Sequence, residues 1–115
     1  MSRSERRNPG APRARHKEWR LKFDAVNQAA LAVLPSLLAR WLPGGRVEGG
    51  REYCVRNPLR SDRRAGSFKI NLRTGHWSDF ATGDRGRDVV SLAAYLSGQR
   101  QTDAARALAD MLGVR

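Results

Sequence analysis

Hydrophobic positions between residues 17 and 42 recur with the period of a helix. Apolar residues recur at steps of three and four, which places them on one helix face: Val26, Ala30, Val33, Leu34, Leu37, Leu38 and Trp41. An apolar stripe of this kind is typical of a helix that packs on a core. We therefore predict an N-terminal helical region with a buried stripe; a surface for a partner helix is the alternative.

The limits of this helical region are less well defined by the sequence. Asp24 is suited to cap a helix that begins at Ala25, but residues 17–23 can equally extend the helix backwards. Pro35 lacks a backbone N–H, so it either kinks one long helix or lies in the first turn of a second one. The run Pro43-Gly44-Gly45 ends the region.

Residues 46–81 show the shorter period of β-strands. Arg46–Val55 is expected to be extended, with a bulge or turn at Gly49-Gly50. Ser67–Leu72 and His76–Phe80 each alternate apolar and polar residues, and Gly75 lies between them. Two alternating runs joined by a short segment with Gly predict a β-hairpin.

The register of this hairpin follows from the assumed turn. A two-residue turn at Thr74-Gly75 pairs Leu72 with Trp77 on the apolar face. The opposite, more polar face then carries Lys69, Arg73 and His76.

The helical period returns after residue 87. Asp88 is a good N-cap and Gly98 a good stop for a helix whose inward positions are Val89, Val90, Leu92, Ala93 and Leu96. Thr102 is expected to cap a last helix that Gly113 closes. Its predicted inward positions are Ala105, Leu108, Met111 and Leu112.

Together these elements predict an α+β fold, a small antiparallel β-sheet packed against an N-terminal helix and two C-terminal helices. We expect a single domain over residues 17–115, helical over 17–43, β over 46–81 and helical over 88–113. Residues 1–16 contain five arginines and almost nothing that can be buried, which predicts a disordered basic arm. The arm either adds phosphate contacts or maintains solubility.

The net charge of the chain indicates what kind of partner the protein binds. The 115 residues include 22 Lys and Arg against 11 Asp and Glu, a net charge of +11. An excess of this size favours a polyanionic partner such as nucleic acid, although an Arg-rich codon bias contributes to it. Cys54 is the single cysteine, which excludes an internal disulfide and fits a reducing cytoplasm. No apolar run is long enough to span a membrane, so no membrane partner is expected.

Catalytic motifs are absent from the sequence. It has no phosphate-binding P-loop, and Cys54, His16 and His76 are too few soft ligands for structural zinc. The loop Gly83–Gly86 is a weak candidate for a phosphate site, and Asp79, Asp84 and Asp88 are weak candidates for a magnesium site. We expect a protein that is not an enzyme and that has no cofactor and no metal.

Two stretches resemble a known family. The run Asn57 to Arg63 followed by Gly66-Ser67-Phe68, and the run His76–Gly83, resemble the zinc-binding domain of bacterial DnaG-type primases. The chain is most similar to the N-terminal region of phage and plasmid primase or primase–helicase proteins, over about Tyr53–Val114. The resemblance implies a zinc-ribbon-like hairpin. The positions it aligns with the four zinc ligands are Asn57, Arg60, Asp79 and Thr82, which implies a ribbon without zinc.

The resemblance and the charge together suggest a function. We expect a non-enzymatic nucleic-acid-binding module, with single-stranded DNA as partner, accessory to priming or replication initiation of a phage, plasmid or other mobile element. The alternative is an adaptor that docks on a separate primase, helicase or host replication protein. The residues expected to hold phosphates are Arg60, Arg63, Arg64, Lys69, Arg73 and Arg85. Trp77 or His76 would stack a base, unless Trp77 packs in the core against Leu72.

Overall fold

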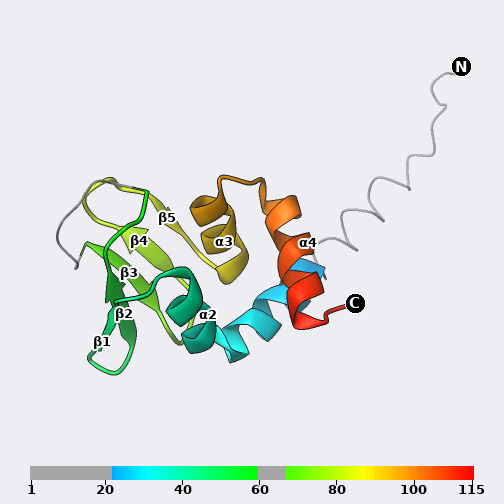
Figure 1. Cartoon of the computed structure of the whole chain (residues 1–115), viewed down its shortest axis with the longest axis horizontal. Coiled ribbons are helices and arrows are strands. Elements are labelled where there is room, and N and C mark those ends of the chain that lie inside the picture. Colours follow the sequence, from blue (N-terminus) through cyan, green and yellow to red (C-terminus); the bar gives the residue numbers. More distant parts are fainter. Residues whose placement is uncertain (1–21, 60–66) are drawn as a thin grey trace, which may run out of the picture.

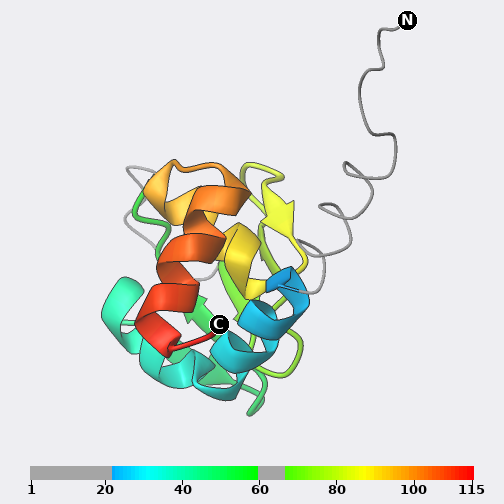
Figure 2. The same ribbon diagram turned by 90° about the vertical axis from the view of Figure 1, so that its right-hand side faces the viewer.

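The computed structural model describes residues 22–59 and 67–115, which form four helices and a five-stranded antiparallel sheet (Figure 1). The predicted α+β fold class is therefore confirmed. The helices gather on one side of the sheet, as two perpendicular views show (Figures 1 and 2). The predicted arm, residues 1–16, and three predicted phosphate contacts, Arg60, Arg63 and Arg64, lie outside the described residues.

The N-terminal helical region consists of two helices, one over residues 22–32 and α2 (Leu34–Trp41). The two helices are separated by a turn at Val33, whose N–H donates to the carbonyl oxygen of Ala30 at 3.1 Å. Pro35 lies in the first turn of α2, where backbone N–H groups have no acceptor within the helix. Pro35 therefore lies in the first turn of a second helix, as one of the two interpretations of the sequence predicted, and does not kink one long helix. Asp24 lies inside the first helix, so its assignment as the N-cap is wrong.

The sheet is a meander in which each strand pairs antiparallel with the next one along the chain. Its strands are β1 (Arg46–Glu48), β2 (Glu52–Val55), β3 (Phe68–Asn71), β4 (Trp77–Asp79) and β5 (Arg85–Gly86). The predicted extended stretch Arg46–Val55 forms the hairpin β1–β2. Its turn contains Gly49 and Gly50, both with positive φ (61° and 68°), a conformation that glycine adopts without steric cost.

The edge strand β5 was not predicted, because the sequence between Thr82 and Gly86 has the composition of a loop. Two residues are too few to show the alternation by which a strand is recognised. Gly86 is required here for packing: a Cβ would collide with the indole of Trp77 and the hydroxyl of Ser91. β5 therefore exists because of its tertiary contacts.

The predicted β3–β4 hairpin is present, but its register differs by two residues from the prediction. Trp77 lies opposite Ile70 and not opposite Leu72. The Oδ1 atom of Asn71 accepts hydrogen bonds from the N–H groups of Arg73 (2.8 Å) and Thr74 (3.1 Å), so the connection spans residues 72–75. Because side chains alternate with a period of two, the shift leaves Trp77 on the predicted face.

The helix α3 (Val89–Ser97) begins and ends where the sequence predicts. Asp88 is the N-cap: its Oδ1 accepts from the N–H of Ser91 at 2.8 Å, and the hydroxyl of Ser91 accepts from the N–H of Asp88 at 3.4 Å. This reciprocal pair is a capping box. Gly98 ends the helix in the left-handed conformation (φ 70°).

The last helix, α4 (Gln101–Leu112), differs from the prediction in two respects. It begins after Arg100 without a side-chain cap, so the assignment of Thr102 as its N-cap is wrong. Met111 is 45% exposed, so its inward assignment is wrong as well. Gly113 closes the helix as predicted.

The core lies between the inner face of the sheet and the helices. The sheet contributes Val55, Phe68, Ile70 and Trp77, and the helices contribute Val26, Ala30, Leu34, Leu37, Leu38, Val89, Val90, Leu92, Ala105 and Leu108, all buried. The apolar stripe of the N-terminal region is therefore core, as predicted, except for Val33, which is 39% exposed, and Trp41, which is only half-buried. Among the described helices, none has the length and apolar character needed to cross a membrane.

Candidate nucleic-acid interface

The outer face of the sheet carries a row of side chains that crosses all five strands. Cross-strand pairing places Arg46 beside Cys54, Cys54 beside Lys69, Lys69 beside Ser78 and Ser78 beside Arg85. Residues that pair directly across a sheet point to the same side of it. The alternate positions of β3 and β4 are buried against the helices, so this row lies on the face that the helices leave open.

A hollow of about 630 Å³ opens on this outer face over β3, β4 and β5. We call it the polar hollow. Its lining residues are Glu52, Lys69, Asn71, His76, Trp77, Ser78, Arg85, Gly86 and Arg87. Four of the predicted nucleic-acid-binding residues, Lys69, His76, Trp77 and Arg85, are thus brought together at one place.

The positive charge of the polar hollow is available to a ligand. Within the described residues, Arg85 and Arg87 form no ion pair, and Lys69 has only a long contact of 4.0 Å with Glu48. An exposed pair at that distance is worth little, so a phosphate can replace it. Asn71 and Ser78 add hydrogen-bonding groups beside these cations.

Trp77 lines the polar hollow, but its side chain belongs to the core. It is 5% exposed, its ring centroid lies 4.6 Å from that of Tyr95, and its Nε1 donates to the hydroxyl of Ser91 at 3.0 Å. Phe68 packs edge-on against it at 6.1 Å. Trp77 is therefore not a stacking platform for a base, and the exposed ring in the hollow is that of His76.

Arg73 does not share the outward face of β3 with Lys69, which corrects the predicted basic strip. β3 ends at Asn71, and Arg73 lies exposed in the turn that follows. The strip predicted from Lys69 and Arg73 along one strand is replaced by a row that crosses the strands from Lys69 to Arg85.

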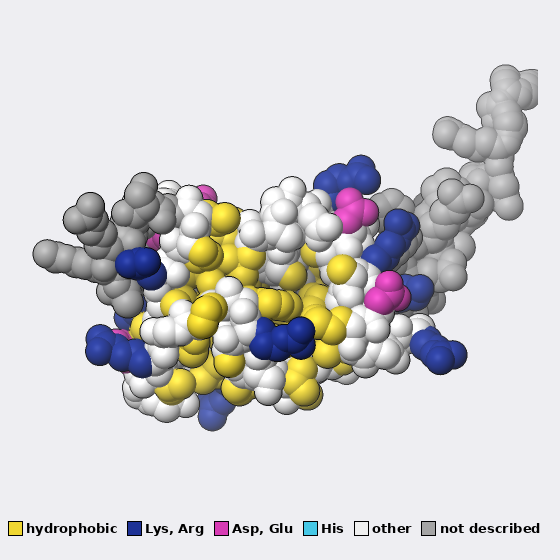
Figure 3. All heavy atoms as spheres, viewed as in Figure 1, with side chains coloured by type: hydrophobic (Ala, Val, Ile, Leu, Met, Phe, Trp, Pro, Cys, Tyr) yellow, Lys and Arg dark blue, Asp and Glu magenta, His cyan; other side chains and the backbone are white. Residues whose placement is uncertain are grey.

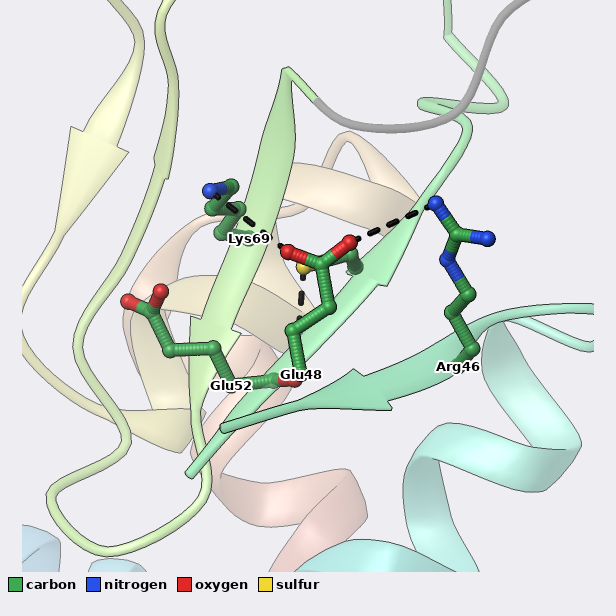
Figure 4. Close-up of polar contacts among 5 residues, drawn as sticks. Arg46, Glu48, Glu52 and Lys69 are labelled. Carbon is green, nitrogen blue, oxygen red and sulfur yellow. Dashed lines mark hydrogen bonds and ion pairs between the residues drawn. The ribbon is translucent and has the colours of Figure 1, made fainter. Parts of the chain in front are cut away.

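The β1–β2 end of the outer face is acidic. Glu48 reaches between Arg46 and Lys69, with Oε2 3.4 Å from the guanidinium and Oε1 4.0 Å from the ammonium (Figure 4). Glu52 lies opposite Glu48 in the β1–β2 pairing and also lines the polar hollow. The outer face thus carries two carboxylates beside Arg46 on β1 and β2 and only cations among the charged side chains of β3 and β5, a feature that the sequence analysis did not detect.

Cys54 lies in this outer row but is fully covered. Burial raises the pKa of the Cys54 thiol, and the nearby Glu48 carboxylate acts in the same direction. The thiol is therefore protonated at neutral pH and is neither a nucleophile nor a good metal ligand.

A buried polar cluster joins the loop after β2 to the end of β4. The Nδ2 of Asn57 donates to Oδ2 of Asp79 and to the hydroxyl of Tyr95, both at 2.9 Å. Burial raises the pKa of Tyr95, so its hydroxyl stays protonated and donates to Oδ2 of Asp84 at 2.8 Å. The backbone N–H of Ala81 supplies a further donor to Asp79.

This cluster occupies two of the positions that the primase resemblance aligns with zinc ligands, Asn57 and Asp79. Thr82, at a third, accepts from the N–H of Asp84 at 3.2 Å, and Arg60, at the fourth, lies outside the described residues. In the part of the chain that the structure describes, His, Cys, Asp and Glu side chains form no group of three that could hold a metal ion. The cluster links the segment after β2 to the end of β4 by hydrogen bonds.

Some residues of the polar hollow were not predicted. Arg87 follows Arg85 at a spacing of two, which is a strand signal, but the segment had been interpreted as a loop. Asn71 alternates with Lys69 on β3 and was recognisable from that parity. Glu52 reaches the hollow from the neighbouring strand β2, a contact that no local pattern reveals.

Comparison with models of known protein families found no match to this chain, and comparison with curated proteins found no match either.

Proposed function

We propose that the protein is a non-enzymatic module that binds single-stranded DNA across the outer face of its sheet, accessory to priming or replication initiation. The observation that carries this proposal is the polar hollow, where Lys69, Arg85 and Arg87 surround an exposed His76. Proteins that hold single strands combine a basic groove for the phosphates with aromatic rings for the bases. In this protein the cations would contact phosphates and His76 would stack a base.

The dimensions of the sheet fit this role. Lys69 and Arg85 lie on β3 and β5, separated by β4, so their backbones are roughly 10 Å apart. Both side chains can therefore contact one strand of nucleic acid. Such a strand would lie across β3, β4 and β5, away from Glu48. Glu52 lines the hollow, so its negative charge would repel the phosphates of that strand (Figure 4).

The resemblance to the primase zinc ribbon supports the same conclusion from a different direction. In that family the hairpin domain is associated with the template strand. We propose that this chain keeps the hairpin surface, uses the Asn57–Asp79 hydrogen bond where the family uses zinc, and acts in the cytoplasm for a phage, plasmid or other mobile element.

The proposal is tested with a double variant, Lys69→Ala with Arg85→Ala, and a labelled oligothymidine titrated at several salt concentrations. Each lost phosphate contact should lower the slope of log K against log salt by about 0.7. We therefore expect weaker binding and a slope that is smaller by about 1.4 for the double variant. Thermal unfolding should be unchanged, because both side chains lie on the outer face.

Two controls separate local contacts from overall charge. Arg100→Ala with Arg115→Ala removes the same charge from exposed positions outside the polar hollow, and should change the slope much less. Glu52→Gln removes a repulsive charge from the hollow and should strengthen binding. If the two double variants behave alike, or if the wild type shows no DNA binding even at low salt, the outer face is not the binding site and the adaptor alternative is favoured.

A further inference from the structure

A second hollow, mainly apolar, lies on the helical side of the molecule. Its volume is about 480 Å³, and we call it the apolar groove. Its lining comes from the C-terminal end of α2, the segment after β2, and the facing sides of α3 and α4. Trp41, Leu59, Leu96 and Met111 form its larger walls, while Ala93, Ala104 and Ala107 leave space between them. In Figure 3, hydrophobic side chains gather over α2, α3 and α4 on this face.

Large apolar side chains stay exposed at this groove. Leu59 is 52% exposed and Met111 is 45% exposed, whereas Ala104, Ala105 and Leu108 of α4 are buried. Scattered exposed apolar residues are common, but a contiguous set that lines one hollow marks an interaction site. The groove has the form that accommodates an amphipathic helix, whose side chains at successive turns enter between two helices.

The charges around the groove select among possible occupants. Among the described residues that line it none is acidic, and Trp41 and Pro58 also line an adjoining hollow that includes Arg56. Arg40, next to Trp41, is exposed. At the other end Asp103 is paired with Arg100 at 3.4 Å, so that end is close to neutral.

These features favour a protein partner with acidic residues. Nucleic acid is a poor occupant, because the groove offers apolar walls and few phosphate contacts. A second copy of this chain is disfavoured, since each copy has a net charge of +11. The segment 1–16 is disfavoured for the same reason, because it has five arginines and one glutamate.

We propose that the apolar groove docks an amphipathic helix of another protein, with large apolar side chains on one face and acidic residues along its border. The groove and the polar hollow share no lining residue. The partner helix and a nucleic acid could therefore be bound at the same time. The proposal does not depend on the proposed DNA binding.

The test uses three labelled synthetic peptides and fluorescence anisotropy with the full chain. The first is a 16-residue helix with Leu at positions i, i+4, i+7 and i+11 and Glu at most others, the pattern of a groove-binding helix. The second replaces Glu by Lys, and the third has the composition of the first in scrambled order. We expect the first peptide to bind at least about tenfold more tightly than either of the others. The scrambled peptide controls for attraction by net charge alone.

Variants locate the binding on the protein. Leu59→Ser with Met111→Ser should weaken the first peptide about tenfold or more, and Arg56→Glu should weaken it as well. Val47→Ser is the matched control, because Val47 is 53% exposed but lies on the edge strand β1 and is not among the residues that line the groove. Val47→Ser and Lys69→Glu should leave peptide affinity within about twofold. Leu59 and Met111 are exposed, so the double variant is expected to fold, as circular dichroism would verify.

Three results would overturn the proposal. Equal affinity for the ordered and scrambled acidic peptides would reduce the interaction to net charge. A dimer in sedimentation that Met111→Ser dissociates would make the groove a contact between copies. Tighter peptide binding after deletion of residues 1–16 would show that the chain's own N-terminal segment competes for the groove.

Discussion

At the scale of single residues, Asn57 is a polar side chain whose burial and hydrogen bonds could not be recognised from the sequence. It is 1% exposed, and all its polar groups are used: Nδ2 bonds to Asp79 and Tyr95, and Oδ1 accepts from the N–H of Leu59 at 2.9 Å. Asp79 is itself completely buried. A buried carboxylate is tolerated only while donors surround it. Asn57 therefore stabilises the loop after β2 and the end of β4 together.

We predict that Asn57→Ala lowers the free energy of unfolding by about 1–3 kcal/mol, because it leaves buried polar groups without one of their partners. Urea denaturation measures this change. Gln99→Ala, which removes an exposed amide, is the control and should have almost no effect. An Asn57→Ala protein with an unchanged midpoint would show that the cluster contributes nothing to stability.

The stability of an Asn57→Asp variant as a function of pH tests the same cluster. The substitution would place a second carboxyl group beside Asp79, and like charges in a buried site raise the pKa of the pair above its unfolded value. The folded state then binds more protons than the unfolded state, so this variant should lose stability as the pH rises and regain part of it in mild acid.

At the scale of the elements, α2 and α3 contribute Leu37 and Leu92 to the core. These side chains are 3% and 0% exposed and belong to one core cluster with Phe68 and Ile70. The pattern of apolar positions predicted this packing, since both helices need one buried face. We therefore expect the hydrophobic contacts between helices and sheet to be the main source of stability among the described residues.

We predict that Leu37→Ala and Leu92→Ala each lower the free energy of unfolding by about 2–5 kcal/mol, the usual cost of emptying a buried leucine site. The matched control is Leu59→Ala, the same chemical change at a side chain that is 52% exposed. It should cost far less. Chemical denaturation measures the free energy of unfolding of the three variants. Equal small effects at all three positions would mean that Leu37 and Leu92 lie at the surface.

At the scale of the whole molecule, the net charge of +11 acts over more than one surface. The polar hollow provides local cations, while residues 1–16 bring five arginines and one glutamate. Long-range attraction between a basic segment and nucleic acid is screened by salt, with a Debye length of about 8 Å at physiological ionic strength. The two contributions should therefore be separable by salt.

We predict that deletion of residues 1–16 weakens binding to single-stranded DNA less than Lys69→Ala with Arg85→Ala does, and that the effect disappears as salt is raised. Titrations of both proteins over the same salt series measure it. Binding that is lost only on deletion, with the double variant unaffected, would mean that these residues are the whole DNA-binding site.

The sequence by itself determined those features that depend on local chemistry. The N-terminal helical region follows from its apolar stripe, although Pro35 was compatible with one kinked helix as well as with two helices, and α3 follows from Asp88 and Gly98 as its caps. The outward position of Lys69 on β3 follows from strand alternation. Each of these is set by residues within a few positions of one another, so no long-range information is needed.

The tertiary structure decided the features that join distant segments. Trp77 is core because Tyr95 and Ser91 of α3 meet it, β5 forms because Gly86 fits against that indole, and the hairpin register depends on how Asn71 closes the turn. The polar hollow combines Glu52, Lys69 and Arg85 from three strands, which only sheet pairing brings together. Side-chain periodicity determines on which face of the sheet a residue lies. Its neighbour on the adjacent strand depends on the packing of the whole chain, since many strand registers satisfy the same local pattern.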